Sequence, residues 1–130
     1  MISRPALRRV LGVFSLFLLS LTAGVRDADA VEKKEFRILH IMSYHSPWRW
    51  TDRQLEGFQS ELKGLKVRYE VFQMDTKRNS GRDQKERKGQ EARALIATWK
   101  PDLVYTSDDD AQEYVARHYV NQPLPFVFSG

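Results

Sequence analysis

The hydrophobic pattern of this chain switches repeatedly between two periods. Short runs rich in apolar, β-branched or aromatic residues are typical of strands, and apolar residues that recur at three- and four-residue steps are typical of one helix face. The strands are expected at residues 36–42, 67–74, 103–106 and 125–128. The helices are expected at residues 51–63, 83–99 and 109–119. Gly64 and Pro101 then stop the first two helices.

The order of these elements predicts the fold class. It is β-α-β-α-β-α-β, and strands joined by helical crossovers form parallel sheets. The sequence therefore predicts an α/β fold with an open, doubly wound parallel sheet. No helix follows the last strand within the 130 residues, although a strand inside such a sheet needs cover on both faces. We therefore expect residues 31–130 to be a truncated, incomplete N-terminal α/β lobe of a larger protein.

The first 30 residues have the pattern of an export signal. Arg4, Arg8 and Arg9 precede the apolar run at 10–19, and Ala28-Asp29-Ala30 has the small-x-small pattern of a cleavage site. The uncharged stretch at 10–25 is shorter than the roughly 20 residues that span a bilayer. The sequence thus predicts a signal peptide at 1–30, cleaved after Ala30, and a periplasmic or otherwise exported protein. An uncleaved membrane anchor is the alternative.

Composition narrows the function classes further. The chain has no cysteine, which excludes disulfides, thiolate metal sites and a lipid-anchored cysteine. Its formal net charge is +4, but four of the 21 basic residues and two of the 17 acidic residues lie in the predicted signal peptide. The remaining charges are nearly balanced and evenly mixed, so no nucleic-acid partner is expected.

Polar side chains collect where the predicted strands end. These positions are Ser43-Tyr44-His45, 75–78, Ser107-Asp108-Asp109-Asp110 and Ser129-Gly130. In an open parallel sheet the carboxyl ends of the strands share one edge, and ligands bind in the crevice outside it. The sequence therefore predicts a binding site for a small molecule at this edge.

The individual candidates have alternatives. Trp48, next to Tyr44 and His45, adds the apolar surface that lines small-molecule pockets, whereas Trp50 is expected to pack. Ser107 and Asp108 have the composition of a helix cap. Three successive carboxylates exceed what a cap needs, and they require a partner, which is a ligand amine, Lys77 or Arg78, or solvent.

Catalysis has little support in the sequence. Ser43 lies two residues before His45, but no G-x-S-x-G turn surrounds it. No glycine-rich phosphate loop follows the first strand, so no nucleotide cofactor is expected. The three histidines fall on three different elements without ligand spacing, which argues against a metal site. We expect a protein that is not an enzyme, and an exported hydrolase that uses Ser43 or the carboxylates is the weakest alternative.

Four segments, in this order and spacing, resemble one known family. They are ILHIMSYHSPWRWTDRQLEGF, FQMDTKR, KPDLVYTSDDDAQEYV and LPFVFSG. They resemble the ABC-transporter substrate-binding proteins of the tryptophan/tyrosine-binding type, which have the type I periplasmic-binding-protein fold. The resemblance extends from Phe36 to Gly130 and covers the first part of the family's first lobe.

The resemblance implies an exported receptor whose two lobes close over a small solute and deliver it to a membrane permease. Related domains serve as the extracellular input of sensor kinases or cyclase-type receptors, and this is the alternative function. By resemblance, first-lobe ligand contacts come from Ser43, Tyr44, His45, Ser107, Asp108, Asp109 and Ser129. We expect a neutral or zwitterionic ligand whose amine meets Asp108 and Asp109, while Ser43 and Ser107 bind polar groups and Tyr44 and Trp48 give apolar contact.

Overall fold

A computed structural model describes residues 34–130. The strands are β1 (Phe36–Met42), β2 (Val67–Gln73), β3 (Leu103–Ser107) and β4 (Phe126–Ser129). The helices are α1 (Arg49–Glu61), α2 (Arg82–Trp99), α3 (Asp109–Tyr114) and the short 3₁₀ helix η1 (Ala116–Tyr119). Each strand and helix predicted from the pattern is present, and apart from the third helix no end differs by more than two residues. The predicted signal peptide lies outside the described residues.

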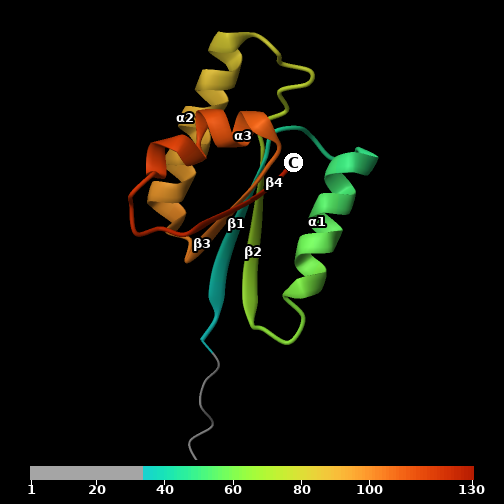
Figure 1. The fold of residues 1–130 in the computed structure, drawn as a ribbon, viewed down its shortest axis with the longest axis vertical. Coiled ribbons are helices and arrows are strands. Elements are labelled where there is room, and N and C mark those ends of the chain that lie inside the picture. Colours follow the sequence, from blue (N-terminus) through green and yellow to red (C-terminus); the bar gives the residue numbers. More distant parts are fainter. Residues whose placement is uncertain (1–33) are drawn as a thin grey trace, which may run out of the picture. The chain divides into compact units, whose positions relative to one another are not determined.

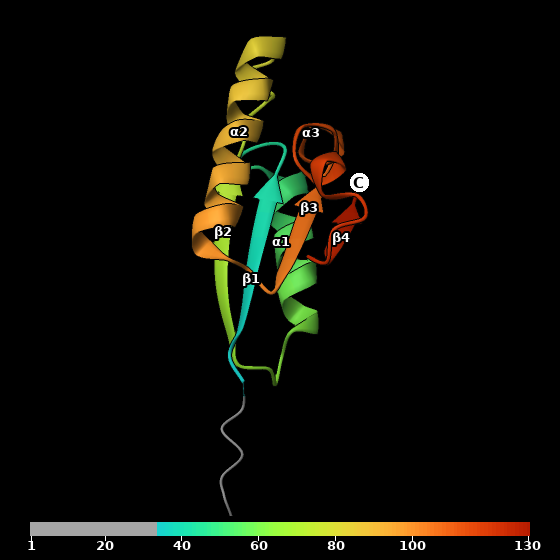
Figure 2. The same cartoon turned by 90° about the vertical axis from the view of Figure 1, so that its left-hand side faces the viewer.

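The four strands form one parallel sheet in the order β2-β1-β3-β4 (Figures 1 and 2). The open α/β architecture predicted from the sequence is therefore confirmed. Helix α1 covers one face of the sheet, and α2 and α3 cover the other (Figure 1). Strand β1 pairs on both sides, with β2 and with β3. This central position explains why its residues from Ile38 to Met42 are all buried.

The main core lies between the sheet and the pair α2–α3. Its buried members come from all these elements and are Leu39, Ile41, Met74, Ala92, Ile96, Val104, Ala111, Tyr114 and Val115. On the α1 side, three aromatic rings form a stack. Phe58 stacks on Tyr105 with ring centroids 4.1 Å apart, and Tyr105 stacks on the buried His40 at 4.2 Å.

The third predicted helix is shorter than the sequence suggested. One helix over 109–119 was expected, but α3 ends at Tyr114 and η1 begins at Ala116. At Val115 the backbone leaves the helical region, with φ −127° and ψ −67°. The Arg93 guanidinium donates to the Tyr114 carbonyl, which an uninterrupted helix would need for its own hydrogen bond. As a result His118, expected on the inner face, is exposed.

Helices α2 and α3 approach each other closely at Gly89. A Cβ atom at this position would lie 2.6 Å from the Tyr114 carbonyl oxygen and 2.8 Å from the Tyr114 Cβ. Glycine weakens a helix interior by about 1 kcal/mol relative to alanine. Its presence in α2 therefore follows from helix packing, which the hydrophobic pattern does not reveal.

Gly89→Ala is expected to destabilise the protein despite the better helix propensity of alanine. Overpacking costs typically about 1–3 kcal/mol, which exceeds the propensity gain. Gly57→Ala in α1 is the matched control, because a Cβ there meets nothing within 4 Å. It should raise the free energy of unfolding by about 0.5–1 kcal/mol. Urea denaturation of both variants measures the difference, and equal midpoints would contradict the close approach.

No helix within residues 34–130 is long and apolar enough to cross a membrane.

Candidate functional site

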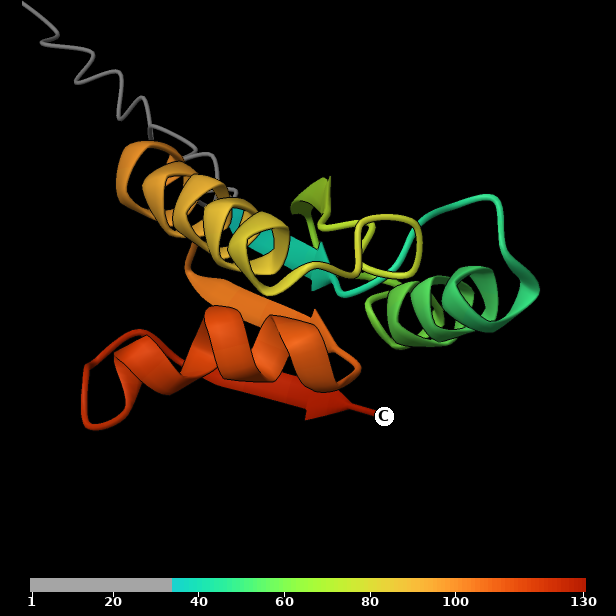
Figure 3. The same ribbon diagram turned by 90° about the horizontal axis from the view of Figure 1, so that it is seen from above.

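The carboxyl ends of the strands and the loops that follow them meet at one edge of the sheet, as Figure 3 shows from above. At this edge the Met74 N–H donates to the Met42 carbonyl, and the Asp108 N–H donates to the Ser129 carbonyl, at 2.9 and 2.8 Å. The polar residues that the sequence placed at separate strand ends are therefore neighbours in space.

Ser43 lies beneath the surface of this edge and joins three elements. Its hydroxyl donates to the Ser107 carbonyl at 2.7 Å and accepts from the Ala111 N–H at 2.7 Å. The Ser107 hydroxyl lies 3.0 Å from Nε2 of His40. Ser43 and Ser107 are both fully buried. These two serines therefore hold β1, β3 and α3 together, and their hydroxyls are already engaged within the protein.

The start of α3 is capped by a residue from the loop that follows β1. Asp108 occupies the cap position, but its carboxylate makes no capping hydrogen bond. Instead the Ser43 hydroxyl accepts the Ala111 N–H, one of the donors that an isolated helix start leaves unpaired. The interpretation of Asp108 as an ordinary helix cap is therefore wrong, and its carboxylate is left for other contacts.

Asp108 is held in a demanding conformation. Its φ is 64° and its ψ is 173°, a region that non-glycine residues adopt at a cost of about 1–3 kcal/mol. Its side chain is buried, and Oδ1 accepts the indole N–H of Trp50 at 2.9 Å. Oδ2 is shielded from solvent and has no hydrogen-bond donor within residues 34–130. A buried carboxylate oxygen without a donor is unfavourable, so a donor from outside these residues would stabilise it.

The three successive carboxylates avoid one another by pointing to different partners. Asp110 accepts from the Thr76 hydroxyl at 2.5 Å and pairs with Lys85 at 2.9 Å. The hydrogen bond from Lys85 to Asp110 and the negative charge of Asp110 raise the pKa of Lys85, and partial burial opposes this rise. Asp109 is exposed. Of the partners expected for this cluster, Arg78 pairs instead with Asp75, at 2.8 and 3.0 Å.

The aromatic residues form a cluster beside the carboxylates. The rings of Tyr44 and Trp48 meet edge to face, with centroids 5.3 Å apart, and His45 stacks on Trp48 at 6.1 Å. Nδ1 of His45 lies 3.3 Å from Oδ1 of Asp75. Partial burial raises the pKa of the Tyr44 hydroxyl, and the negative charges of Asp108, Asp110 and Asp109 raise it further. The Tyr44 hydroxyl therefore lies within the field of all three carboxylates.

Two residues at this edge were misjudged or overlooked in the sequence. Trp50 was expected to pack, but it is 54% exposed and binds Asp108, so that assignment is wrong. Thr76 was expected only as one of the polar residues 75–78, yet it is buried and its backbone N–H donates to the Ser43 carbonyl at 2.9 Å. Its position directly after a strand that ends beside Ser43 is the signal that could have identified it.

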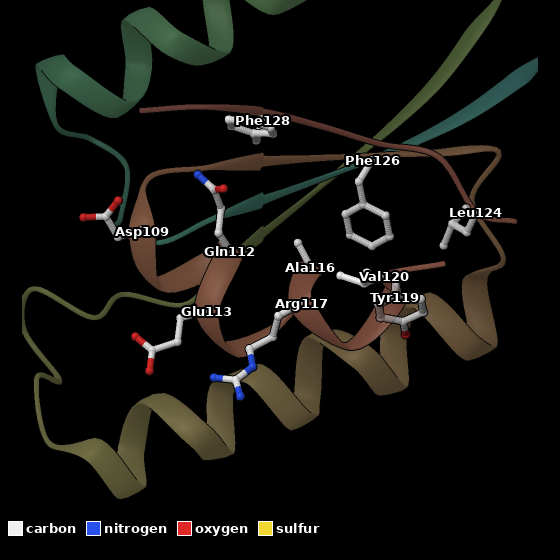
Figure 4. A pocket seen from close by; sticks show the side chains of 10 residues that line it. All are labelled: Asp109, Gln112, Glu113, Ala116, Arg117, Tyr119, Val120, Leu124, Phe126 and Phe128. Atoms are coloured by element: carbon white, nitrogen blue, oxygen red, sulfur yellow. The ribbon is translucent and has the colours of Figure 1, made fainter. Parts of the chain in front are cut away.

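A larger hollow lies elsewhere on the described residues. It has a volume of about 680 Å³ and lies between α3–η1 and β4, with Phe126 and Phe128 forming an apolar wall (Figure 4). Asp109 lines both this hollow and a smaller cavity at the carboxyl edge. The smaller cavity at the edge has a volume of about 300 Å³ and a mostly polar lining, made of Tyr44, Thr76, Lys77, Ser80, Lys85, Asp109 and Asp110.

Among residues 34–130, no three histidine or carboxylate side chains are grouped closely enough to hold a metal ion. Comparison of the chain with protein-family models, with curated proteins and with solved structures found no match.

Proposed function

We propose that this chain is a ligand-binding domain that recognises the amine of a small organic solute through Asp108. The observation that carries the proposal is the buried Oδ2 atom of Asp108, which has no hydrogen-bond donor among residues 34–130. A ligand ammonium group offers up to three N–H donors and a compensating charge. The half-exposed indole of Trp50 donates to the other oxygen of this carboxylate, Oδ1, so the amine would donate to Oδ2.

The surroundings of Asp108 are suited to a small organic molecule. Tyr44, Trp48 and Trp50 supply aromatic surface at the same edge, and the half-buried Tyr44 borders the cavity of about 300 Å³. Aromatic walls with a few convergent polar groups are the usual lining of ligand sites. In this proposal Ser43 and Ser107 act beneath the ligand, because their hydroxyls are buried and paired with protein groups.

The cellular role in this proposal is that of an exported substrate-binding protein of the ABC-transporter type. It is supported by the signal-peptide pattern at 1–30 and by the resemblance of residues 36–130 to that family. The open parallel sheet with its polar carboxyl edge is compatible with the first lobe of such a receptor. Delivery of the solute to a membrane permease is part of the same proposal.

Calorimetry of the full chain with a panel of amino acids and small amines tests the proposal. Asp108→Asn is expected to weaken amine binding by about ten- to a hundredfold, because a hydrogen bond to a charged group is worth about 1.5–3 kcal/mol. Asparagine preserves the shape of the side chain and tolerates a positive φ. Asp83→Asn, at an exposed carboxylate of α2, changes the net charge equally and should leave binding unchanged. If no member of the panel binds, or if both variants bind equally well, the proposal fails.

A further inference from the structure

The sheet has two edge strands, and their side chains differ. The order β2-β1-β3-β4 leaves β2 and β4 with one neighbouring strand each. Strand β2 carries the exposed charged residues Arg68 and Glu70, and such charges keep an edge strand from pairing with another chain. Residues 119–130, which include β4, carry no charged side chain. The β4 edge therefore lacks the protection that the β2 edge has.

The backbone of β4 presents hydrogen-bonding groups on its outer side. The carbonyls of Pro125 and Ser129 accept N–H groups at the two ends of β3, at 3.0 and 2.8 Å. Successive residues of a strand point their N–H and C=O groups to opposite sides, so those of Phe126 and Phe128 face away from β3. Pro125 lacks an N–H only on the side of β3. Two donors and two acceptors therefore face outward along this edge.

Apolar side chains are exposed on both faces of β4. Phe128 is 68% exposed and, with Phe126, borders the hollow of about 680 Å³ on the α3 face (Figure 4). Val127 is 42% exposed and borders a second apolar hollow, of about 480 Å³, which Phe58 and Leu62 of α1 also line. Removal of such surface from water is the main driving force of protein association. The side chains and the backbone of β4 therefore both favour the addition of another strand.

We propose that β4 pairs with β4 of a second copy of this chain, antiparallel and about a two-fold axis perpendicular to the sheet. Phe126 of one copy then lies opposite Phe128 of the other, and each such pair exchanges two hydrogen bonds. These bonds use all the outward groups of both strands. Val127 lies opposite its own counterpart on the α1 face, and the two sheets become one continuous sheet.

The charges beside the larger hollow favour a second copy over an unrelated strand. Asp109 and Glu113 border this hollow towards the carboxyl end of β4, and Arg117 borders it towards the other end (Figure 4). None of the three forms an ion pair within residues 34–130. Because the two-fold axis reverses the direction of the second copy, its Arg117 comes to the end that carries Asp109 and Glu113. The two copies are therefore complementary in charge at both ends of the interface.

Sedimentation equilibrium of the full chain over a range of concentrations tests the dimer. The mass should rise from monomer to dimer, and hydrogen exchange at the Phe126 and Phe128 amides should slow as the dimer forms. Val127→Lys and Val127→Glu should each raise the dimer dissociation constant about tenfold or more, because an apolar contact is lost and like charges lie directly opposite each other. An equimolar mixture of the two variants should restore association, because opposite charges then meet at position 127.

Glu70→Lys is the matched control, because it places a lysine at an exposed position of the other edge strand. It should dimerise like the unmodified chain. A chain that stays monomeric at every concentration, or a Val127→Lys variant that associates as well as the unmodified chain, would overturn the proposal. A mixture no tighter than either Val127 variant alone would reject the two-fold register. Slow exchange at Phe126 and Phe128 in a monomer would show that another segment of the same chain covers the edge, and would also overturn the proposal.

Discussion

Acidification from pH 7 to pH 3 is expected to lower the free energy of unfolding by about 4 kcal/mol through His40 alone. This side chain is fully buried between aromatic rings, and burial lowers its pKa from 6.5 to about 3. Between these two values the unfolded chain binds a proton at His40 and the folded chain does not. Stability is therefore highest above pH 6.5, falls as the pH decreases through this window, and loses little more below pH 3.

Urea denaturation at several pH values between 7 and 4 tests this contribution. In His40→Gln the titrating group is gone, while a side-chain amide remains near the Ser107 hydroxyl that lies 3.0 Å from Nε2 of His40. The variant is less stable at pH 7, but its stability should fall less steeply with acid. His118→Gln is the control, because His118 is exposed and should leave the slope unchanged. If His40→Gln shows the same slope as the unmodified chain, the contribution assigned to His40 is wrong.

Ser43→Ala is expected to lower the free energy of unfolding by about 2–4 kcal/mol. The substitution removes the hydrogen bond from the Ser43 hydroxyl to the Ser107 carbonyl, worth about 1 kcal/mol. It also leaves the buried Ala111 N–H without its acceptor, which costs about 1–3 kcal/mol more. The start of α3, and with it the carboxylates of Asp108 and Asp110, should become less well ordered.

Chemical denaturation measures the stability change, and hydrogen exchange locates it. The Ala111 amide should exchange faster in Ser43→Ala than in the unmodified chain. Ser60→Ala is the matched control, since Ser60 also donates to a backbone carbonyl, that of Gly57, but at an exposed position of α1. Its effect should stay within about 0.5 kcal/mol. If the two variants lose similar amounts of unfolding free energy, the buried hydrogen bonds of Ser43 stabilise the protein no more than the exposed one of Ser60.

The local hydrophobic pattern was sufficient for the order of strands and helices. The spacing of hydrophobic residues that distinguishes a strand from a helix can be seen within a short run of the chain. Strands joined by helical crossovers are parallel. The break in the third helix was not predictable in the same way. It depends on Arg93, which lies on a different helix and takes the Tyr114 carbonyl. Gly89 is a similar case, because its neighbour Tyr114 is 25 residues away in sequence.

The location of the candidate site was also predictable, but the roles of its residues were not. Four strand ends share one edge in any open parallel sheet, so Ser43, Tyr44 and Asp108 were expected together. Whether a hydroxyl faces a ligand or the protein depends on hydrogen bonds between strands, and these bury Ser43 and Ser107. Trp50 appeared to be a packing residue because its partner Asp108 is 58 positions further along the chain.

The sequence by itself thus determined the α/β class, the parallel sheet and the edge at which the polar residues gather, because periodicity and strand ends are local properties. It also carries the export pattern at 1–30 and the resemblance from which the cellular role is proposed. Only the tertiary structure decided which charges are compensated. It pairs Lys85 with Asp110 and Arg78 with Asp75. Among residues 34–130 it leaves Lys77 without an ion pair and Oδ2 of Asp108 without a hydrogen-bond donor. Such pairing depends on distances between distant segments, which no local pattern encodes.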